Sequence, residues 1–201
     1  MNTHATDVSV FVRARGTDKA ADYAFLTHAV ARVTGEPVVK LSRYCDHCGA
    51  DSHGRVVVVS PPKAAERVHV SLARAGGLLA VAVSLAGPVG IDIEILSAVR
   101  RAGFDDVAFT PVERTMLRPL AGLAADRARA GLWTAKEAVL KLTGEGLRAD
   151  PRELTVTLDR AAASVSGRSG IHLLDFDPGP GLVGTVAVRT TAPPHLNLSA
   201  G

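Results

Sequence analysis

The two halves of this 201-residue sequence share one order of predicted elements, a helix first and strands after it, and this order constrains the fold most strongly. In the first half, residues 18–33 have a helical pattern that Gly35 closes. In the second half, residues 126–143 have a helical pattern that ends at Gly144. The predicted strands are residues 55–59, 67–72, 78–85, 89–95, 154–158, 171–176 and 182–188. This order predicts an α+β fold of two similar lobes, residues 1–98 and 99–201.

Three local signals refine this outline. Thr110-Pro111-Val112-Glu113 has the hydroxyl, proline and glutamate of a capping box, which starts a helix. Ala86-Gly87-Pro88 predicts a hairpin turn between the strands at 78–85 and 89–95. The segment from Ala192 onward contains prolines, and we expect it to be loosely held.

Composition excludes several classes of protein. Apolar residues make up 47% of the chain and charged residues 21%, as in soluble globular proteins and unlike disordered ones. Two cysteines are too few for a disulfide-dense domain. No run approaches the ~18 to 20 apolar residues of a membrane-spanning helix, and the first twelve residues lack the pattern of a secretion signal. We therefore expect a cytoplasmic protein with no membrane partner.

The charge balance also argues against nucleic acid as a partner. The formal net charge is +3 and aromatic residues make up 4% of the chain. A nucleic-acid binder needs a concentrated basic stripe or aromatic side chains for base stacking. The mild positive charge suits an acidic protein partner instead.

Residues 90–95 carry two carboxylates on one predicted strand. Because side chains alternate between the two faces of a strand, Asp92 and Glu94 point one way and the three isoleucines between and beside them point the other way. The two carboxylates are then ~6.6 Å apart along the strand, which is close enough to bind one cation. The alternative is an edge strand with one solvated face.

Residues 133–141 combine two lysines and a glutamate on one predicted helix. Glu137 and Lys141 are four residues apart and share a helix face, while Lys136 lies ~100° around the helix from Glu137. The alternative is an ordinary surface pair of Glu137 and Lys141, worth ~0.3 to 0.5 kcal/mol. Lysine is rare in this chain, however, and two of its five lysines fall within these six positions.

Together, the Gly-Ile-Asp-Ile-Glu strand at residues 90–94 and the Trp-Thr-x-Lys-Glu-Ala-x-x-Lys helix at residues 133–141 resemble the 4′-phosphopantetheinyl transferases. The chain is most similar to the larger, surfactin-synthetase-activating type. Further matches are residues 48–55, 70–71, 76–77, 109–113 and 144–147, so that the resemblance covers residues 40–150. The larger type fuses two pseudo-equivalent lobes in one monomer. The resemblance therefore implies a pseudo-two-fold axis, an active site at the interface of the lobes and a monomeric state.

The resemblance also implies an activity. Such an enzyme transfers the 4′-phosphopantetheine group from coenzyme A, its co-substrate, to a serine of an acyl or peptidyl carrier protein and releases 3′,5′-ADP. The reaction needs Mg²⁺, with Mn²⁺ as a substitute. The partners are carrier proteins of fatty acid, polyketide or nonribosomal peptide synthases. The alternative is a catalytically decayed relative that only binds coenzyme A or the carrier protein.

The roles of individual residues follow from the same resemblance. Asp92, Glu94 and Glu137 are the implied ligands of Mg²⁺, a cation that prefers oxygen ligands. Glu137 is also the implied base for the carrier serine, and Lys141 the implied stabiliser of the departing 3′,5′-ADP. The implied contacts to coenzyme A are Lys136, Lys141, Ser71, Arg74 and Arg55. Arg74 is a departure, because relatives usually have a histidine there, but arginine can also bind a phosphate.

The segment between the two motifs is the candidate surface for the carrier protein, which has an acidic recognition helix. It offers the basic residues Arg114 and Arg118 with the apolar residues Met116 and Leu117 between them. The alternative is a solvated helix whose arginines keep the protein soluble.

Cys45 and Cys48 raise the question of a zinc site. Cys-x-x-Cys with His47 and His53 nearby offers plausible ligands. A second Cys-x-x-Cys is absent from the sequence, which favours a reduced structural pair of cysteines instead.

Overall fold

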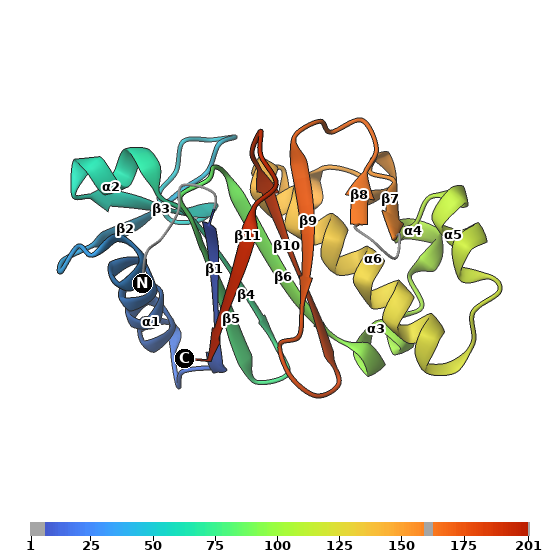
Figure 1. Cartoon of the computed structure of the whole chain (residues 1–201). Coiled ribbons are helices and arrows are strands. Elements are labelled where there is room, and N and C mark those ends of the chain that lie inside the picture. The colour runs from blue at the N-terminus through green and yellow to red at the C-terminus, as the bar shows by residue number, and fades with distance from the viewer. Residues whose placement is uncertain (1–6, 159–162, 201) are drawn as a thin grey trace.

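The computed structural model describes residues 7–158 and 163–200, whose helices and strands form four layers (Figure 1). Helix α1 (Lys19–Thr34) covers the outer face of one sheet, and helix α6 (Gly122–Thr143) covers the outer face of a second sheet. The two sheets pack against each other between these helices. The fold is α+β, as the sequence predicts.

Two sheets and one hairpin contain the described strands. The first sheet has the order β11 (His195–Ala200), β1 (Asp7–Ala14), β5 (Leu78–Ser84) and β4 (His69–Ala75). The second has the order β6 (Val89–Ile95), β10 (Leu182–Arg189), β9 (Ile171–Phe176), β8 (Ala163–Val165) and β7 (Val156–Leu158). Strands β2 (Lys40–Tyr44) and β3 (Arg55–Ser60) form a separate antiparallel hairpin.

The shorter helices lie in the connections. They are α2 (Pro62–Arg67), α3 (Leu96–Ala102), α4 (Asp105–Ala108), α5 (Pro111–Leu117) and the 3₁₀ turns Gly146–Arg148 and Pro151–Glu153. The predicted capping box is present at the start of α5, where the Thr110 side chain accepts from the backbone of Glu113 and the Glu113 side chain accepts from the backbone of Thr110. A search of the described residues finds no helix with the length and hydrophobicity needed to span a membrane.

The caps of α1 explain why this helix was predictable. The side chain of Asp18 accepts a hydrogen bond from the backbone of Ala21, and Gly35 ends the helix in the left-handed conformation at φ +74°. Its buried residues pack against the outward-facing apolar residues of the first sheet, such as Leu79 and Val81.

The alternation predicted for residues 90–95 is confirmed. Ile91 and Ile93 are buried between the two sheets, together with Val8, Val10 and Ala80. Asp92 lies opposite Thr185 of β10, and the hydroxyl of Thr185 contacts the hydroxyl of Thr134 on α6 at 2.8 Å. Since opposite residues of an antiparallel pair share a face, Asp92 and Glu94 lie on the face that α6 covers.

The hairpin predicted at Ala86-Gly87-Pro88 is wrong. Strands β5 and β6 do not pair; they belong to different sheets. Ala80 and Ala82 of β5 and Ile91 and Ile93 of β6 share the core between the sheets, so that the two strands contact each other face to face. The turn therefore carries the chain from one sheet to the other.

The segment after Ala192 is not loosely held, in contrast to the prediction. Residues 195–200 form β11, which pairs in parallel with β1 and completes the first sheet. The alternation of Leu196 and Leu198 with polar residues accounts for the strand. Each sheet thus contains a strand from the other half of the sequence, because β6 pairs with β10 and β11 pairs with β1.

Candidate functional site

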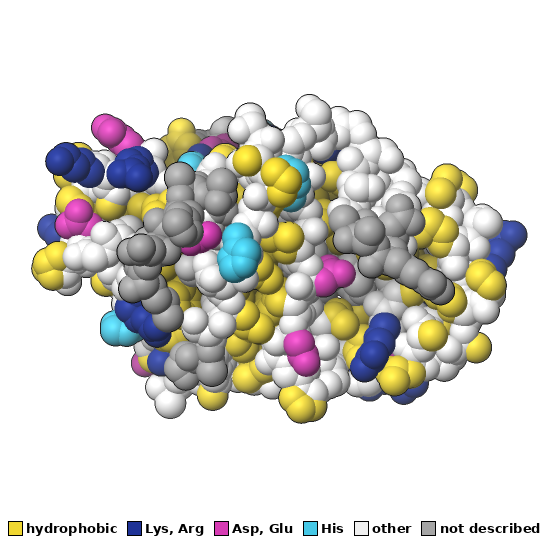
Figure 2. All heavy atoms as spheres, viewed as in Figure 1, with side chains coloured by type: hydrophobic (Ala, Val, Ile, Leu, Met, Phe, Trp, Pro, Cys, Tyr) yellow, Lys and Arg dark blue, Asp and Glu magenta, His cyan; other side chains and the backbone are white. Residues whose placement is uncertain are grey.

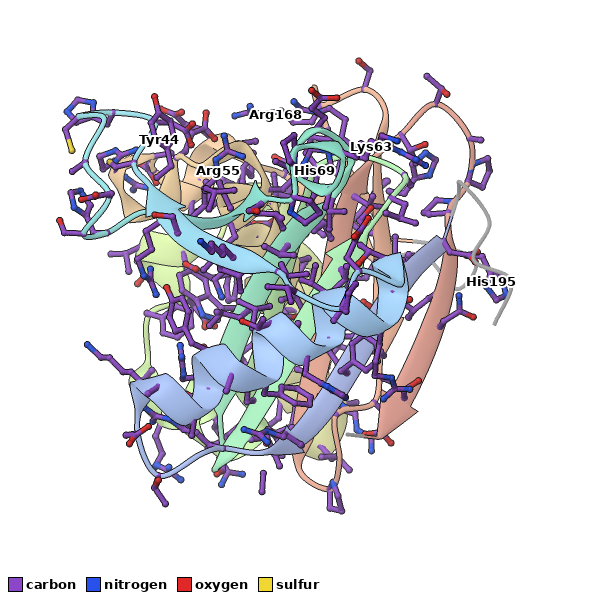
Figure 3. The ribbon with its side chains drawn as sticks, turned by 90° about the vertical axis from the view of Figure 1, so that its left-hand side faces the viewer. Tyr44, Arg55, Lys63, His69, Arg168 and His195 are labelled. Carbon is purple, nitrogen blue, oxygen red and sulfur yellow. The ribbon has the colours of Figure 1, made fainter. Side chains whose placement is uncertain are left out.

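A cavity of about 880 Å³ lies between the β2–β3 hairpin, β4 and the C-terminal end of α6. Five basic side chains and two carboxylates line it: Arg43, Arg55, Arg74, Lys141, Arg148, Asp46 and Glu145. In Figure 3, Tyr44, Arg55 and His69 come from β2, β3 and β4 and gather toward the upper part of this face, with Arg168 near them. We call it the basic cavity. Its size is in the range of small-molecule and cofactor sites, and its excess of cations suits an anionic ligand.

Burial and positive charge also affect His69 at the wall of the basic cavity. Burial of the ring, and next the charge of Arg55, lower the pKa of His69. Both effects favour the neutral form of His69, which adds no positive charge to the cavity.

Asp92, Glu94 and Glu137, which we call the carboxylate cluster, come together where β6 packs against α6. Gly90 makes this packing possible, because a Cβ atom at Gly90 would overlap the carbonyl oxygen of Ala138. The close approach brings the last turns of α6 to Asp92. Lys141 Nζ donates to Asp92 Oδ1 at 2.7 Å and to the carbonyl oxygen of Ile91 at 3.1 Å.

Without a bound cation, the charged forms of the three carboxylates in the carboxylate cluster are destabilised. The pKa of each of the three groups is raised, first by burial and, for Glu94 and Glu137, next by the negative charge of Asp92. Lys141 offsets only part of this effect. A bound cation would reduce the remaining repulsion.

Two oxygen atoms of the carboxylate cluster are buried with no hydrogen-bond partner among the described residues, Asp92 Oδ2 and Glu137 Oε1. Buried carboxylate oxygens are normally paired, so these two are free for a ligand. Their oxygen-only chemistry fits Mg²⁺. The ligand atoms of the three carboxylates do not all lie within 4.8 Å of one another. Because Mg²⁺ binds oxygen at ~2.0 to 2.1 Å, one ion would need a side-chain shift, or a water molecule between it and one of the carboxylates.

Lys141 is the residue that connects the carboxylate cluster with the basic cavity. Its ammonium group binds Asp92, and its side chain lines the cavity. Ser71, Arg74 and Arg55 also line the cavity, so the structure brings together four of the five residues expected to contact coenzyme A. Ser71 Oγ accepts from the backbone of Ile91 and thereby also joins β4 to β6.

Arg74 and Arg55 already have partners. Arg74 Nε donates to Asp22 of α1 at 2.6 Å, and this carboxylate is fully buried. Arg55 donates two hydrogen bonds to Asp46 from Nε and Nη2, at 2.9 and 3.0 Å. These contacts fix the orientation of both guanidinium groups at the wall of the basic cavity.

Lys136 is the fifth residue, and its position does not fit the phosphate contact that the resemblance implies. The side chain is fully buried on the other side of α6. Its Nζ contacts Glu113 Oε2 at 2.6 Å and donates to the carbonyl oxygens of Ala108 and Pro151 at 2.7 and 2.9 Å. An ammonium group has three donors, and all three are used.

The expected carrier surface is only partly exposed. Leu117 is buried in the core beside α6 and offers no free apolar contact, whereas Met116 is half-buried against the same core. Arg114 binds Asp106, whereas Arg118 is exposed. Other apolar side chains are exposed in this region: Val107, Val112, Leu120 and Leu123. Figure 2 shows hydrophobic and basic side chains side by side at the α5 end of the molecule.

Sequence reasoning missed several residues of the site. Asp46, Arg43 and Arg148 line the basic cavity, and Glu113 anchors the buried end of Lys136. The Glu113 side chain also accepts from the backbone of Val156 at 2.7 Å. A capping box signals Glu113 at a helix start, but its partners come from distant segments that no local pattern reveals.

Residues 88–175 match the model of the 4′-phosphopantetheinyl transferase superfamily. The match starts just before β6 and reaches into β9, and it includes the carboxylate cluster and Lys141. The superfamily match thus falls on the segment that carries both sequence motifs. No curated protein matches the chain.

Solved structures give the following similarities. A holo-(acyl-carrier-protein) synthase from Bacillus anthracis in complex with CoA (3′,5′-ADP) has a TM-score of 0.44 and 22% identity over 53% of this chain and 97% of its own. The holo-[acyl-carrier-protein] synthase of Thermotoga maritima has a TM-score of 0.44 and 17% identity over 53% of this chain and 64% of its own.

Proposed function

We propose that this protein is a 4′-phosphopantetheinyl transferase of the two-lobed, surfactin-synthetase-activating type. It transfers 4′-phosphopantetheine from coenzyme A to a serine of an acyl or peptidyl carrier protein. The observation that carries the proposal is the pair of unpartnered buried oxygens, Asp92 Oδ2 and Glu137 Oε1, connected through Lys141 to a cavity with excess positive charge. Asp92, Glu137 and Lys141 lie within the segment that matches the superfamily, whereas most residues that line the cavity precede it.

The basic cavity binds the nucleotide end of coenzyme A in this proposal. Arg55, Arg74 and Lys141 face its phosphates, because charge-assisted hydrogen bonds from fixed donors select phosphate over neutral ligands. Lys136 has no part in this contact; it holds α6 to the core through Glu113.

In the transfer, the carrier serine attacks the phosphorus atom that carries pantetheine, and the bond from that phosphorus to the oxygen bridging it to the adenosine-side phosphate breaks. Glu137 Oε1 accepts the serine proton. Lys141 stabilises the negative charge on the departing 3′,5′-ADP. Asp92, Glu94 and Glu137 would hold Mg²⁺, which would neutralise part of the negative charge of the pyrophosphate.

A mass measurement tests the proposed function. The protein is incubated with coenzyme A, Mg²⁺ and apo carrier proteins of fatty acid, polyketide and nonribosomal peptide synthases. We expect at least one carrier to gain the mass of phosphopantetheine, and the gain to be absent when Mg²⁺ is chelated. Binding of coenzyme A with no mass gain on any carrier would favour the decayed binding module.

Arg74→Ala should weaken coenzyme A binding at least ~10-fold and leave dephospho-coenzyme A nearly unchanged, since a charge-assisted contact contributes ~1.5 to 3 kcal/mol. The expected target is the 3′-phosphate, which only coenzyme A has. Isothermal titration with both ligands measures the difference. Arg15→Ala is the matched control, because Arg15 also contacts Asp22, at 3.5 Å, but does not line the cavity. Equal losses for both ligands in Arg74→Ala would place Arg74 in packing only.

Arg114→Glu combined with Arg118→Glu should raise the KM for the carrier protein and leave the KM for coenzyme A nearly unchanged. The reason is charge repulsion with the acidic helix of the carrier, which salt screens over ~8 to 10 Å. Steady-state kinetics at low and high salt measure the effect. Arg101→Glu, on the exposed face of α3, is the control for a general change of charge. Unaltered carrier kinetics at low salt would move the docking surface away from α5.

A further inference from the structure

The loop between β2 and β3 brings Cys45, Cys48 and His53 together. Within the part of the chain that the structure describes, these three form the one group of histidine, cysteine or acidic side chains whose ligand atoms all lie within 4.8 Å of one another. Both cysteines are free thiols. Cys45 is buried, whereas Cys48 and His53 are exposed, so the group opens toward solvent on one side.

The spacing between one sulfur and the imidazole nitrogen matches a tetrahedral zinc site. Cys48 Sγ and His53 Nε2 are 3.5 Å apart. In a tetrahedral site with Zn–S ~2.3 Å and Zn–N ~2.0 to 2.1 Å, a sulfur and a nitrogen ligand are ~3.5 Å apart. This pair already has the separation that zinc needs, and Cys45 Sγ lies within 4.8 Å of both atoms.

The backbone of the loop is shaped to hold the two sulfur atoms together. Cys45 donates its backbone N–H to Ala50 and accepts from the backbone N–H of Gly49, at 2.9 and 2.8 Å. Gly49 has φ +72°, a conformation that favours glycine. The turn returns the chain so that Cys48 approaches Cys45.

The imidazole of His53 is oriented in the same way. Its Nδ1 lies 3.3 Å from the hydroxyl of Ser52, while Nε2 faces Cys48. A hydrogen-bonding partner on the second ring nitrogen is usual for histidines that bind metals, because it fixes the tautomer and the ring orientation.

We propose that Cys45, Cys48 and His53 bind one Zn²⁺ ion, with solvent as the fourth ligand. The two thiols release their protons to water as the ion binds. The set of two sulfurs and one imidazole selects a borderline-soft ion such as Zn²⁺, whereas the carboxylate cluster offers only oxygen and suits Mg²⁺. The two sites are thus chemically distinct.

Zinc bound in this loop would have a consequence for the basic cavity. Asp46 follows Cys45 directly, and Arg55 lies two residues after His53. These two residues pair with each other and line the cavity. A metal ion that closes the loop therefore holds the Asp46–Arg55 pair in place. Only this consequence rests on the proposed function; zinc binding itself does not.

Metal analysis of the whole chain tests the proposal. Protein loaded with Zn²⁺ and freed of excess ion should contain one zinc per chain by atomic emission. Cys48→Ser should weaken zinc binding by at least ~100-fold in a competition with a chromogenic chelator, since even partners in the second shell contribute ~10 to 100-fold. Co²⁺ in place of Zn²⁺ should give the thiolate charge-transfer absorption in the wild type and not in Cys48→Ser.

Two control variants locate the ion. His47→Ala lies in the same loop but outside the group, and should keep its zinc. Asp92→Asn removes part of the carboxylate cluster and should also keep its zinc, whether or not the protein transfers phosphopantetheine. Zinc content that is negligible in the wild type, unchanged in Cys48→Ser or lost in Asp92→Asn would overturn the proposal.

Discussion

Glu137→Gln is expected to lower the rate of phosphopantetheine transfer by ~10²- to 10⁴-fold, the range that a positioned general base contributes. The amide keeps the size of the side chain but cannot accept the serine proton or serve as an anionic ligand. The initial rate of mass gain on the carrier, at saturating coenzyme A and Mg²⁺, measures the loss. Glu145→Gln is the matched control, because Glu145 lines the basic cavity but binds Thr143 and Arg168 instead of joining the carboxylate cluster.

The same variant should not destabilise the fold. Glu137 has a raised pKa, so its proton is favoured in the folded state, and the charged form destabilises the folded protein once the pH rises above the pKa of the unfolded chain. Replacing it by the neutral amide should therefore leave the Tm at pH 7 equal or higher when Mg²⁺ is absent. Rapid turnover of Glu137→Gln, or a large fall in its Tm, would contradict the role assigned to Glu137.

Lys136→Met should destabilise the protein by ~3 to 5 kcal/mol, the usual cost of leaving one partner of a buried ion pair without the other. Glu113 would keep its backbone contacts to Thr110 and Val156 but lose the only charge that offsets its own within the described structure. Urea denaturation measures the free energy of unfolding. Lys63→Met is the control, because Lys63 is exposed on α2.

A double variant tests whether Lys136 acts through its buried ion pair with Glu113 or through a contact to phosphate. Lys136→Met with Glu113→Gln removes both charges, and we expect it to be more stable than Lys136→Met alone, because no uncompensated charge remains. If Lys136 bound phosphate, Lys136→Met would instead weaken coenzyme A binding with little change in stability.

The helices and most strands could be predicted from the sequence because their signals are local. Asp18 and Gly35 bound α1, the capping box starts α5 and Gly144 ends α6. The pairing of the strands could not be predicted in the same way. Whether β5 and β6 form a hairpin or face each other across two sheets depends on which apolar faces meet, and both arrangements bury Ile91 and Ile93.

The candidate site also contains residues whose positions local patterns predict and residues whose positions they do not. Asp92, Glu137 and Lys141 come together because the strand alternation and the helix period place each of them on the face where β6 meets α6. Lys136 looked equivalent to Lys141 by spacing, but it points to the side of α6 where Glu113, Ala108 and Pro151 provide all of its acceptors. The prediction that Leu117 contacts the carrier protein from the surface was wrong, because α5 is too short for periodicity to show which of its faces is buried. Cys45, Cys48 and His53 converge through the turn at Gly49, which Cys-x-x-Cys alone does not guarantee.

The parallel pairing of β11 with β1 sets an order on how the chain acquires its structure during synthesis. Strand β1 leaves the ribosome long before β11, the strand that pairs with one of its edges. Until then, one edge of β1 presents unpaired backbone groups, and such an edge can pair with other chains. Pairing partners so distant in sequence also form slowly. A nascent chain stalled before Ala192 should therefore aggregate or engage chaperones even though its carboxylate cluster is already complete.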